Sequence, residues 1–147
     1  AFSTLVSVIQ QLNPENKIGK ITLITRFGVD KVNSILPQLI NVISQNKLNV
    51  IWMCDPLHGN TQSDKYGRKF RLLKHAVDET ISTNSILCGN KKHLSGLHLE
   101  ISPNINILEC VTSLDELTQN RNYESALDPR LNKKQCMAYM ENILKCF

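Results

Sequence analysis

The 147-residue sequence predicts an α/β fold in which parallel strands alternate with helices. Short apolar or β-branched runs typical of strands lie between longer segments with helical spacing of apolar residues. Strands that alternate with helices along a chain form parallel sheets with right-handed crossover connections. The strands also end in polar or charged residues, and in parallel α/β proteins chemistry takes place at the carboxyl ends of the strands.

The first half of the chain predicts two helices and a strand. Residues 2–12 carry apolar positions at helical spacing, and the β-branched run at 21–25 is typical of a strand. Residues 31–46 predict a second helix with Asp30 as N-cap, although Pro37 removes one internal hydrogen bond and favours a kink. The apolar face of this helix consists of Val32, Ile35, Leu36, Leu39, Ile40 and Ile43.

The second half predicts two more strands and two more helices. A strand at 48–54 is followed by a polar loop at 59–69 and a helix at 70–82, and a third strand covers 96–102. Asn132 is the expected cap of a last helix that ends near residue 146. The apolar face of this last helix would be Met137, Met140, Ile143 and Leu144, and the expected connections are residues 83–95 and 103–128.

Composition is that of one soluble domain without an internal boundary. The hydrophobic share is 41%, no apolar run is long enough to span a membrane, and the first residues lack a secretory signal. Five cysteines without a C-x-x-C pair argue against a disulfide scaffold or zinc ribbon and favour reduced thiols inside the cell.

The net charge of +4 arises from 17 basic and 13 acidic residues, a mild excess spread along the chain. A solvated loop and helix start, or a subsite for a phosphorylated ligand, would each explain the densest basic cluster. Aromatic residues make up only 5% of the chain and no recognition motif accompanies the charge, so we expect no nucleic-acid partner. The basic cluster consists of Lys65, Arg68, Lys69, Arg71 and Lys74.

Four residues at or near strand ends are candidates for a site. Arg26 follows the first strand and His58 the second, Glu100 lies near the end of the third, and Asp128 precedes the last helix. Parallel strands point one way, so these side chains should gather on one rim. One histidine and two carboxylates suit a divalent ion such as Mn²⁺, Fe²⁺ or Zn²⁺, and an arginine beside them suits a phosphate or carboxylate ligand. His98 alternates with leucines and should face the other side of its strand.

Each of these four residues also has a purely structural explanation. Asp128 is placed to cap the last helix region, and Arg26 to pair with a carboxylate. His58 can hydrogen-bond a loop carbonyl, and Glu100 can face solvent. Their shared placement on one rim favours the functional interpretation.

Five segments together resemble one enzyme family. Their order and approximate spacing match the carboxyl-terminal part of the class II, plant and mycobacterial type, 3-deoxy-D-arabino-heptulosonate 7-phosphate synthases. The pairing of CDP-x-HGNT with DPRLN is the most specific part of the resemblance. The segments are NPENKIGKITLITRFG at 13–28, VIWMCDPLHGNT at 50–61, GLHLE at 96–100, LEC at 108–110 and DPRLN at 128–132.

The resemblance implies a (β/α)8 barrel of which this chain supplies the last three βα units. It implies a condensation of phosphoenolpyruvate with erythrose 4-phosphate, and a location in the cytoplasm or in an organelle such as a plastid. It implies a divalent metal, Mn²⁺ first and Co²⁺, Fe²⁺ or Zn²⁺ as alternatives. The corresponding metal ligands are His58, Glu100 and Asp128. The corresponding substrate-binding residues are Arg26, for phosphoenolpyruvate, His58, and Lys69 and Arg71, for the phosphorylated substrates.

A complete barrel takes about 250 residues, so the resemblance also implies that something else closes the site. The family's fourth metal ligand is a cysteine of its amino-terminal part, and Cys54 does not match it in position. We therefore expect another chain or an amino-terminal segment to complete the barrel, and an oligomeric assembly, since three strands leave open edges. The alternative is a non-catalytic remnant of the barrel that serves as a structural or interaction subunit.

Overall fold

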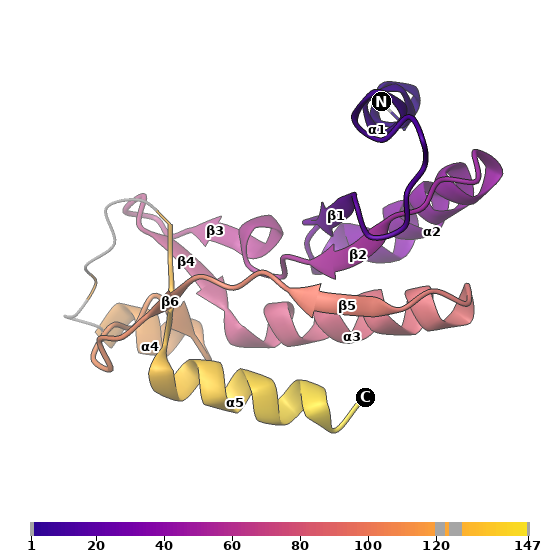
Figure 1. Ribbon diagram of the computed structural model, residues 1–147. Coiled ribbons are helices and arrows are strands. Elements are labelled where there is room, and N and C mark those ends of the chain that lie inside the picture. Colours follow the sequence, from indigo (N-terminus) through magenta and orange to yellow (C-terminus); the bar gives the residue numbers. More distant parts are fainter. Residues whose placement is uncertain (1, 120–122, 124–127, 147) are drawn as a thin grey trace.

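A computed structural model shows an α/β arrangement built on a three-stranded parallel sheet, as expected. The sheet has the order β1-β2-β5, formed by Thr22–Thr25, Ile51–Cys54 and Leu94–Leu97. The arrowheads of these strands point toward the same end of the molecule (Figure 1). The structure describes residues 2–119, 123 and 128–146.

Four longer helices accompany the sheet: α1 (Phe2–Leu12), α2 (Val29–Gln45), α3 (Leu73–Gly89) and α5 (Lys133–Leu144). Helix α3 packs against both α2 and α5, and α1 packs against α2. The predicted apolar face of α2 supplies much of the main core, which is contiguous from α1 to α3. The buried members of this core are Ile9, Val32, Leu36, Leu39, Ile40, Ile43, Trp52 and Leu87.

A second layer covers the end of the sheet toward which the strands point (Figure 1). After β2 the chain makes a 3₁₀ turn, η1 (His58–Asn60), and then an antiparallel hairpin of β3 (Thr61–Ser63) and β4 (Lys69–Leu72). Strand β4 also pairs in parallel with β7 (Cys110–Val111), which is followed by α4 (Leu114–Gln119). The hairpin therefore lies beside the carboxyl ends of the parallel strands.

A two-stranded parallel ladder joins the last two loops. It pairs β6 (Ile101–Ser102) with β8 (Leu131–Asn132), directly before α5. Asn132 caps α5 as predicted, because its Oδ1 accepts the N–H of Gln135 at 2.8 Å and the Gln135 side chain accepts the N–H of Asn132 at 3.0 Å. This ladder ties the chain around Glu100 to the chain that follows Asp128.

Several predicted boundaries are wrong. Asp30 lies in the first turn of α2 but does not cap it: the N-cap is Gly28, and the Oδ1 of Asn60 accepts the N–H of Val29 instead. The expected polar loop at 59–69 contains the hairpin, and the helix expected at 70–82 begins after β4 and continues to Gly89. Whether a polar segment pairs as a hairpin depends on its contacts with other parts of the chain, which the local sequence does not predict.

The third strand and the last helix also differ from expectation. The strand predicted at 96–102 is two short pieces, β5 and β6, so Glu100 lies in the connection between them. On α5, Met137 and Leu144 are 56% and 66% exposed, whereas Tyr139 and Ile143 are buried. Tyr139 takes the core position because its hydroxyl lies 2.6 Å from the Thr80 hydroxyl on α3. The expected loop at 103–128 contains β7 and α4, and its residues 120–122 and 124–127 lie outside the described part.

Within residues 2–119 and 128–146 no helix has both the length and the apolar character that crossing a bilayer requires. The five cysteines, all in the described part of the chain, are free thiols.

Candidate metal centre

His58 is presented by a turn that Asp55 organises. Strand β2 ends at Cys54, and Asp55 extends its ladder by donating its N–H to the carbonyl of Thr25 at 2.7 Å. The Asp55 side chain then turns back, and its Oδ1 accepts the N–H groups of Leu57 and His58, each at 3.1 Å. These two backbone donors would otherwise be unpaired at the start of η1. Asp55 therefore fixes where the His58 side chain begins.

Asp55 also fixes the orientation of the His58 ring. The Oδ2 of Asp55 lies 2.6 Å from the Nδ1 of His58, and the aspartate is fully buried. An ionised carboxylate can only accept a hydrogen bond, so Nδ1 carries a proton, and Nε2 is the ring nitrogen left to bind a metal ion. A carboxylate behind the imidazole is the arrangement found behind metal-binding histidines.

Glu100 approaches His58 from the connection between β5 and β6. Its Oε1 lies 3.5 Å from the Nε2 of His58, and its Oε2 pairs with the Nη1 of Arg71 at 2.8 Å. Arg71, on β4, is fully buried. Its guanidinium also bonds the Thr61 hydroxyl at 2.8 Å and the carbonyl of Pro129, while its buried Nη2 has no hydrogen-bond partner among the described residues. Arg71 thus lies behind the site and holds both Glu100 and the backbone next to Asp128.

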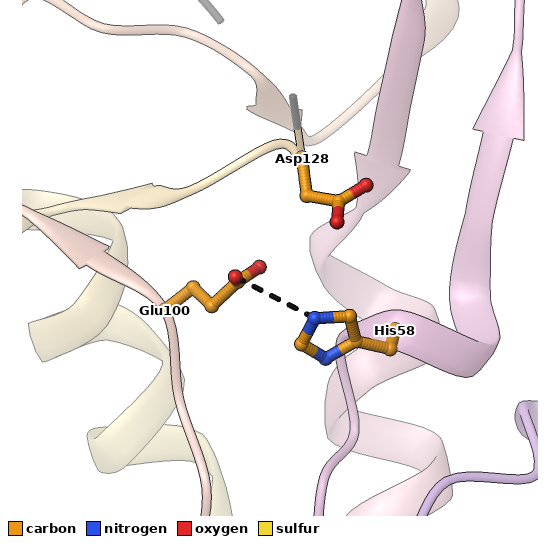
Figure 2. Close-up of side chains that lie close together, drawn as sticks. All are labelled: His58, Glu100 and Asp128. Atoms are coloured by element: carbon orange, nitrogen blue, oxygen red, sulfur yellow. Dashed lines mark ion pairs between the residues drawn. The ribbon is translucent and has the colours of Figure 1, made fainter. Parts of the chain in front are cut away.

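Asp128 completes the group from the loop before β8. Its Oδ1 pairs with the Nζ of Lys69 at 3.0 Å, and this interaction lowers the pKa of the Asp128 carboxyl below its usual range. Lys69 and Arg71 therefore balance the two carboxylates from one side of the hairpin. One ligand atom from each of His58, Glu100 and Asp128 lies within 4.8 Å of the others (Figure 2).

This group fits a divalent cation. Figure 2 shows the His58 ring and the two carboxylates directed toward a common space from three separate segments. An imidazole nitrogen and two carboxylates match the preferences of Mn²⁺, Fe²⁺ and Zn²⁺. The Asp55 carboxylate and the Arg71 guanidinium already hold two of the ligands in place, so binding would require little reorganisation.

Arg26 lies on the same rim, beside the histidine. Its Nη2 is 3.4 Å from the Oδ2 of Asp55, the same oxygen that contacts His58, yet its side chain remains 52% exposed. Arg26 is thus anchored by a buried carboxylate and still accessible to an anion. A guanidinium next to a metal centre is suited to bidentate binding of a phosphate or carboxylate.

Comparison with known proteins assigns the chain to a family. A sequence model of the class-II DAHP synthetase family matches residues 1–143. The chain belongs to this family. The match confirms the resemblance drawn from the five segments.

Proteins similar in sequence to this chain occur in fungi and bacteria. The phospho-2-dehydro-3-deoxyheptonate aldolase of Neurospora crassa is 41% identical over 140 residues, which cover 92% of this chain and 29% of that protein. The enzyme of the same name, AroG, of Mycolicibacterium smegmatis is 36% identical over 90% of this chain and 29% of its own length. A protein of the same name from Streptomyces lividans is 34% identical over 88% of this chain and 89% of its length. The chain thus spans less than a third of the first two relatives.

The structure brings together the residues that the sequence placed on one rim, with one difference in detail. Arg71, expected to contact phosphorylated substrates, is buried behind Glu100, whereas Lys69 is half-exposed at the edge. His98 faces the side of its strand opposite to Leu97 and Leu99, as expected: both leucines pack against a core cluster that contains Tyr139, whereas the ring centroid of His98 lies 6.3 Å from that of His58. The N–H of His98 donates to the carbonyl of Cys54 at 2.8 Å, so the alternation of side chains continues past the last residue of β5.

Sequence reasoning missed Asp55 and Glu79. Asp55 directly follows the second predicted strand, and an aspartate three residues before a candidate ligand is a detectable signal. Glu79 lies in the middle of α3 and carries no local signal of its role. Burial raises the pKa of the Glu79 carboxyl, and hydrogen bonds from Gly28, Phe27 and Asn60 oppose this rise.

Proposed function

We propose that this chain supplies the metal centre and the last three βα units of the barrel in a 3-deoxy-7-phosphoheptulonate synthase, which condenses phosphoenolpyruvate with erythrose 4-phosphate. The observation that carries the proposal is the convergence of His58, Glu100 and Asp128 beside Arg26. Membership of the class-II DAHP synthetase family supports the reaction type. This reaction is the first step of the shikimate pathway toward aromatic amino acids.

His58, Glu100 and Asp128 would hold the metal, with Mn²⁺ the first candidate and Co²⁺, Fe²⁺ and Zn²⁺ the alternatives. When bound, the ion would supply Lewis-acid stabilisation of charge on the aldehyde oxygen of erythrose 4-phosphate. Asp55, which holds the Nδ1 of His58, would keep Nε2 oriented to bind the ion.

Arg26 would bind and orient phosphoenolpyruvate. Its exposed guanidinium is held in one direction by Asp55, so less rotational freedom is lost when the anion binds. Lys69 would contribute to a phosphate subsite at the rim, since its ammonium is half-exposed next to Asp128. Arg71 would act on the substrates chiefly through Glu100, because its charge is close to the site while its atoms are buried.

An amino-terminal segment or another chain would complete the barrel around this site. Among the described residues β1 and β5 each pair only with β2, so the sheet has two open edges. Barrel strands are covered on both faces, whereas Ile24 of β1 is 40% exposed here. An exposed apolar strand face with open edges requires a covering partner, and in a barrel that partner is further strands.

The test is a complementation assay. The protein is assayed alone and after mixing with the amino-terminal two thirds of the Neurospora crassa relative, in the presence of Mn²⁺, for consumption of phosphoenolpyruvate and formation of the heptulosonate product. We expect activity in the mixture only. No product in either sample would contradict the enzymatic function and favour the non-catalytic subunit, whereas activity of the chain alone would contradict the need for a partner.

Two histidine variants give the matched comparison. His58→Ala removes a proposed ligand and should abolish product formation in the mixture. His93→Ala removes an exposed histidine before β5, at the opposite end of the sheet, and should retain at least about half of the activity. Equal loss in both variants would indicate a general folding effect and count against His58 as a ligand.

A further inference from the structure

Glu79 is a fully buried carboxylate in the middle of α3 that serves the active-site loops and not its own helix. Its Oε1 accepts the backbone N–H groups of Phe27 and Gly28, each at 3.0 Å. Its Oε2 accepts the Nδ2 of Asn60 at 2.7 Å. One side chain thus bonds the loop after β1 and the turn after β2 at the same time.

Asn60 extends the connection between the same two loops. Its Oδ1 accepts the N–H of Val29 at 2.9 Å, and its Nδ2 also donates to the carbonyl of Pro56 at 2.8 Å. Glu79 and Asn60 therefore satisfy three consecutive backbone donors, at residues 27, 28 and 29, at the start of helix α2. Two of them, those of the N-cap Gly28 and of Val29, are donors that a helix N-terminus leaves unpaired.

Two glycines let the loops approach to backbone contact. A Cβ on Gly28 would lie 2.5 Å from the carbonyl oxygen of Gly59, and a Cβ on Gly59 would lie 2.4 Å from the nitrogen of Gly28. Gly28 also has a φ of +85°, in the region that favours glycine. The two loops are therefore pressed together with no side chain between them, and Glu79 holds them there.

The energetic cost of Glu79 suggests a role beyond stability. A buried carboxylate must be compensated by several hydrogen bonds, and an apolar residue of similar size is often no less stabilising. The same helix position could be filled without a charge if α3 only had to pack on α2. What a carboxylate provides here is two acceptor oxygens at fixed separation, one for each loop.

We propose that Glu79 is a positioning residue that holds the Arg26 loop against the His58 turn, and so sets the phosphoenolpyruvate-binding arginine relative to the metal centre. The inference rests on the function proposed above. Arg26 directly precedes the two residues whose N–H groups Glu79 binds, and His58 lies two residues before Asn60 in η1.

The hydrogen-bond network separates this role from metal binding. The metal-site side chains are held by Asp55 and Arg71, and the hydrogen bonds of Glu79 go to neither. Loss of Glu79 should therefore displace Arg26 more than it disturbs His58, Glu100 and Asp128. The expected signature is a weaker interaction with phosphoenolpyruvate at nearly unchanged metal affinity.

The experiment compares Glu79→Gln with Thr80→Val in the complemented enzyme. Glutamine has nearly the same size as glutamate but only one acceptor oxygen. Its amide NH2 group therefore faces either the N–H groups of Phe27 and Gly28 or the side-chain NH2 group of Asn60, and one set of hydrogen bonds is lost. Thr80 is the next residue on α3, is equally buried, and bonds the Tyr139 hydroxyl away from the two loops. Thr80→Val thus removes a buried hydrogen bond of α3 without touching either loop.

For Glu79→Gln we expect the KM for phosphoenolpyruvate to rise by about tenfold or more, since small misplacements of orienting groups cost up to about a hundredfold. The Mn²⁺ dissociation constant should stay within about twofold of the unmodified protein. Thr80→Val should lower the melting temperature and leave both constants unchanged. An unchanged KM in folded Glu79→Gln, or a parallel loss of metal affinity, would overturn the proposal.

Two further measurements cover the other outcomes. Amide hydrogen exchange should show protected N–H groups at Phe27 and Gly28 in the unmodified chain, and rapid exchange in the unmodified chain would overturn the proposal without any variant or assay. If Glu79→Gln does not fold, Gly59→Ala separates the same loops with Glu79 intact and should reproduce the rise in KM, whereas an unchanged KM would overturn the proposal. If no heptulosonate is formed at all, the proposed function fails, while the exchange rates still decide whether Glu79 anchors the loop.

Discussion

Replacement of Asp55 by asparagine tests what fixes the orientation of His58 in the proposed metal centre. The asparagine oxygen can still accept the N–H groups of Leu57 and His58, so the turn should persist. Its amide nitrogen, however, replaces the oxygen that lies 2.6 Å from the Nδ1 of His58. Two donors then face each other, and the ring relieves this by moving its proton to Nε2, the atom required for the metal.

The magnitude follows from this change of tautomer. Loss of a carboxylate behind a metal-bound histidine typically weakens metal binding by about 10- to 100-fold, or about 1.4 to 2.8 kcal/mol. In Asp55→Asn, Arg26 also loses its ion-pair partner and no longer attracts the turn that carries His58. We therefore expect the loss of Mn²⁺ affinity to lie in the lower half of this range. The free energy of unfolding should fall by only about 1 to 2 kcal/mol, since one hydrogen bond is lost and two are kept.

The assay is a calorimetric Mn²⁺ titration of the unmodified protein, Asp55→Asn and Asp64→Asn. Asp64 is the matched control, because it also accepts backbone N–H groups of a turn, at Tyr66 and Arg68, but bonds to no residue of the metal centre. Nitrogen chemical shifts of His58 report the tautomer independently. If folded Asp55→Asn binds Mn²⁺ within twofold of the unmodified protein and keeps the proton on Nδ1, the proposed role of Asp55 is wrong.

Three further outcomes are expected. Arg71→Met should lower the free energy of unfolding by about 2 kcal/mol in urea denaturation, less than the about 3 to 5 kcal/mol for a fully buried ion pair, because the carboxylate partner of Arg71 is partly exposed. As the control, Lys74→Met removes an ion pair at the surface and should cost below about 0.5 kcal/mol. Equal costs would contradict the role of Arg71. Burial raises the pKa of Cys54 to about 12. Iodoacetamide at pH 8 should therefore label the exposed Cys146 and leave Cys54 unmodified, as measured by mass spectrometry. Equal labelling of the two cysteines would show that β2 opens readily. Asn132→Ala removes the side-chain oxygen that accepts the N–H of Gln135 but keeps the backbone N–H that donates to the Gln135 side chain, and it should cost about 1 to 2 kcal/mol by the same denaturation. No measurable cost would show that packing alone fixes the start of α5.

The charge arrangement explains how the site tolerates two adjacent carboxylates. Glu100 pairs with Arg71 and Asp128 with Lys69, so each acid has a cation on the hairpin side. The side facing His58 remains available for a further positive charge. Binding of a divalent ion would therefore add charge without displacing the two basic partners.

The sequence by itself determined the alternation of helices and strands and the rim on which the candidate residues meet. The apolar period of α2 and the β-branched run of β1 are local patterns, and both elements formed where they were expected. Arg26 and His58 follow strand ends directly, so the parallel direction of the strands was enough to place them together. The DPRLN and HGNT segments then indicated the family.

The tertiary structure alone decided how these residues are held. The roles of Arg71 and Glu79 depend on contacts with residues up to 58 positions away, and such pairings leave no periodic trace in the chain. The proximity of His98 to His58, whose ring centroids lie 6.3 Å apart, likewise depends on the pairing of β5 with β2. Local sequence predicts which side chains reach a rim, whereas hydrogen bonds between distant segments determine their geometry there.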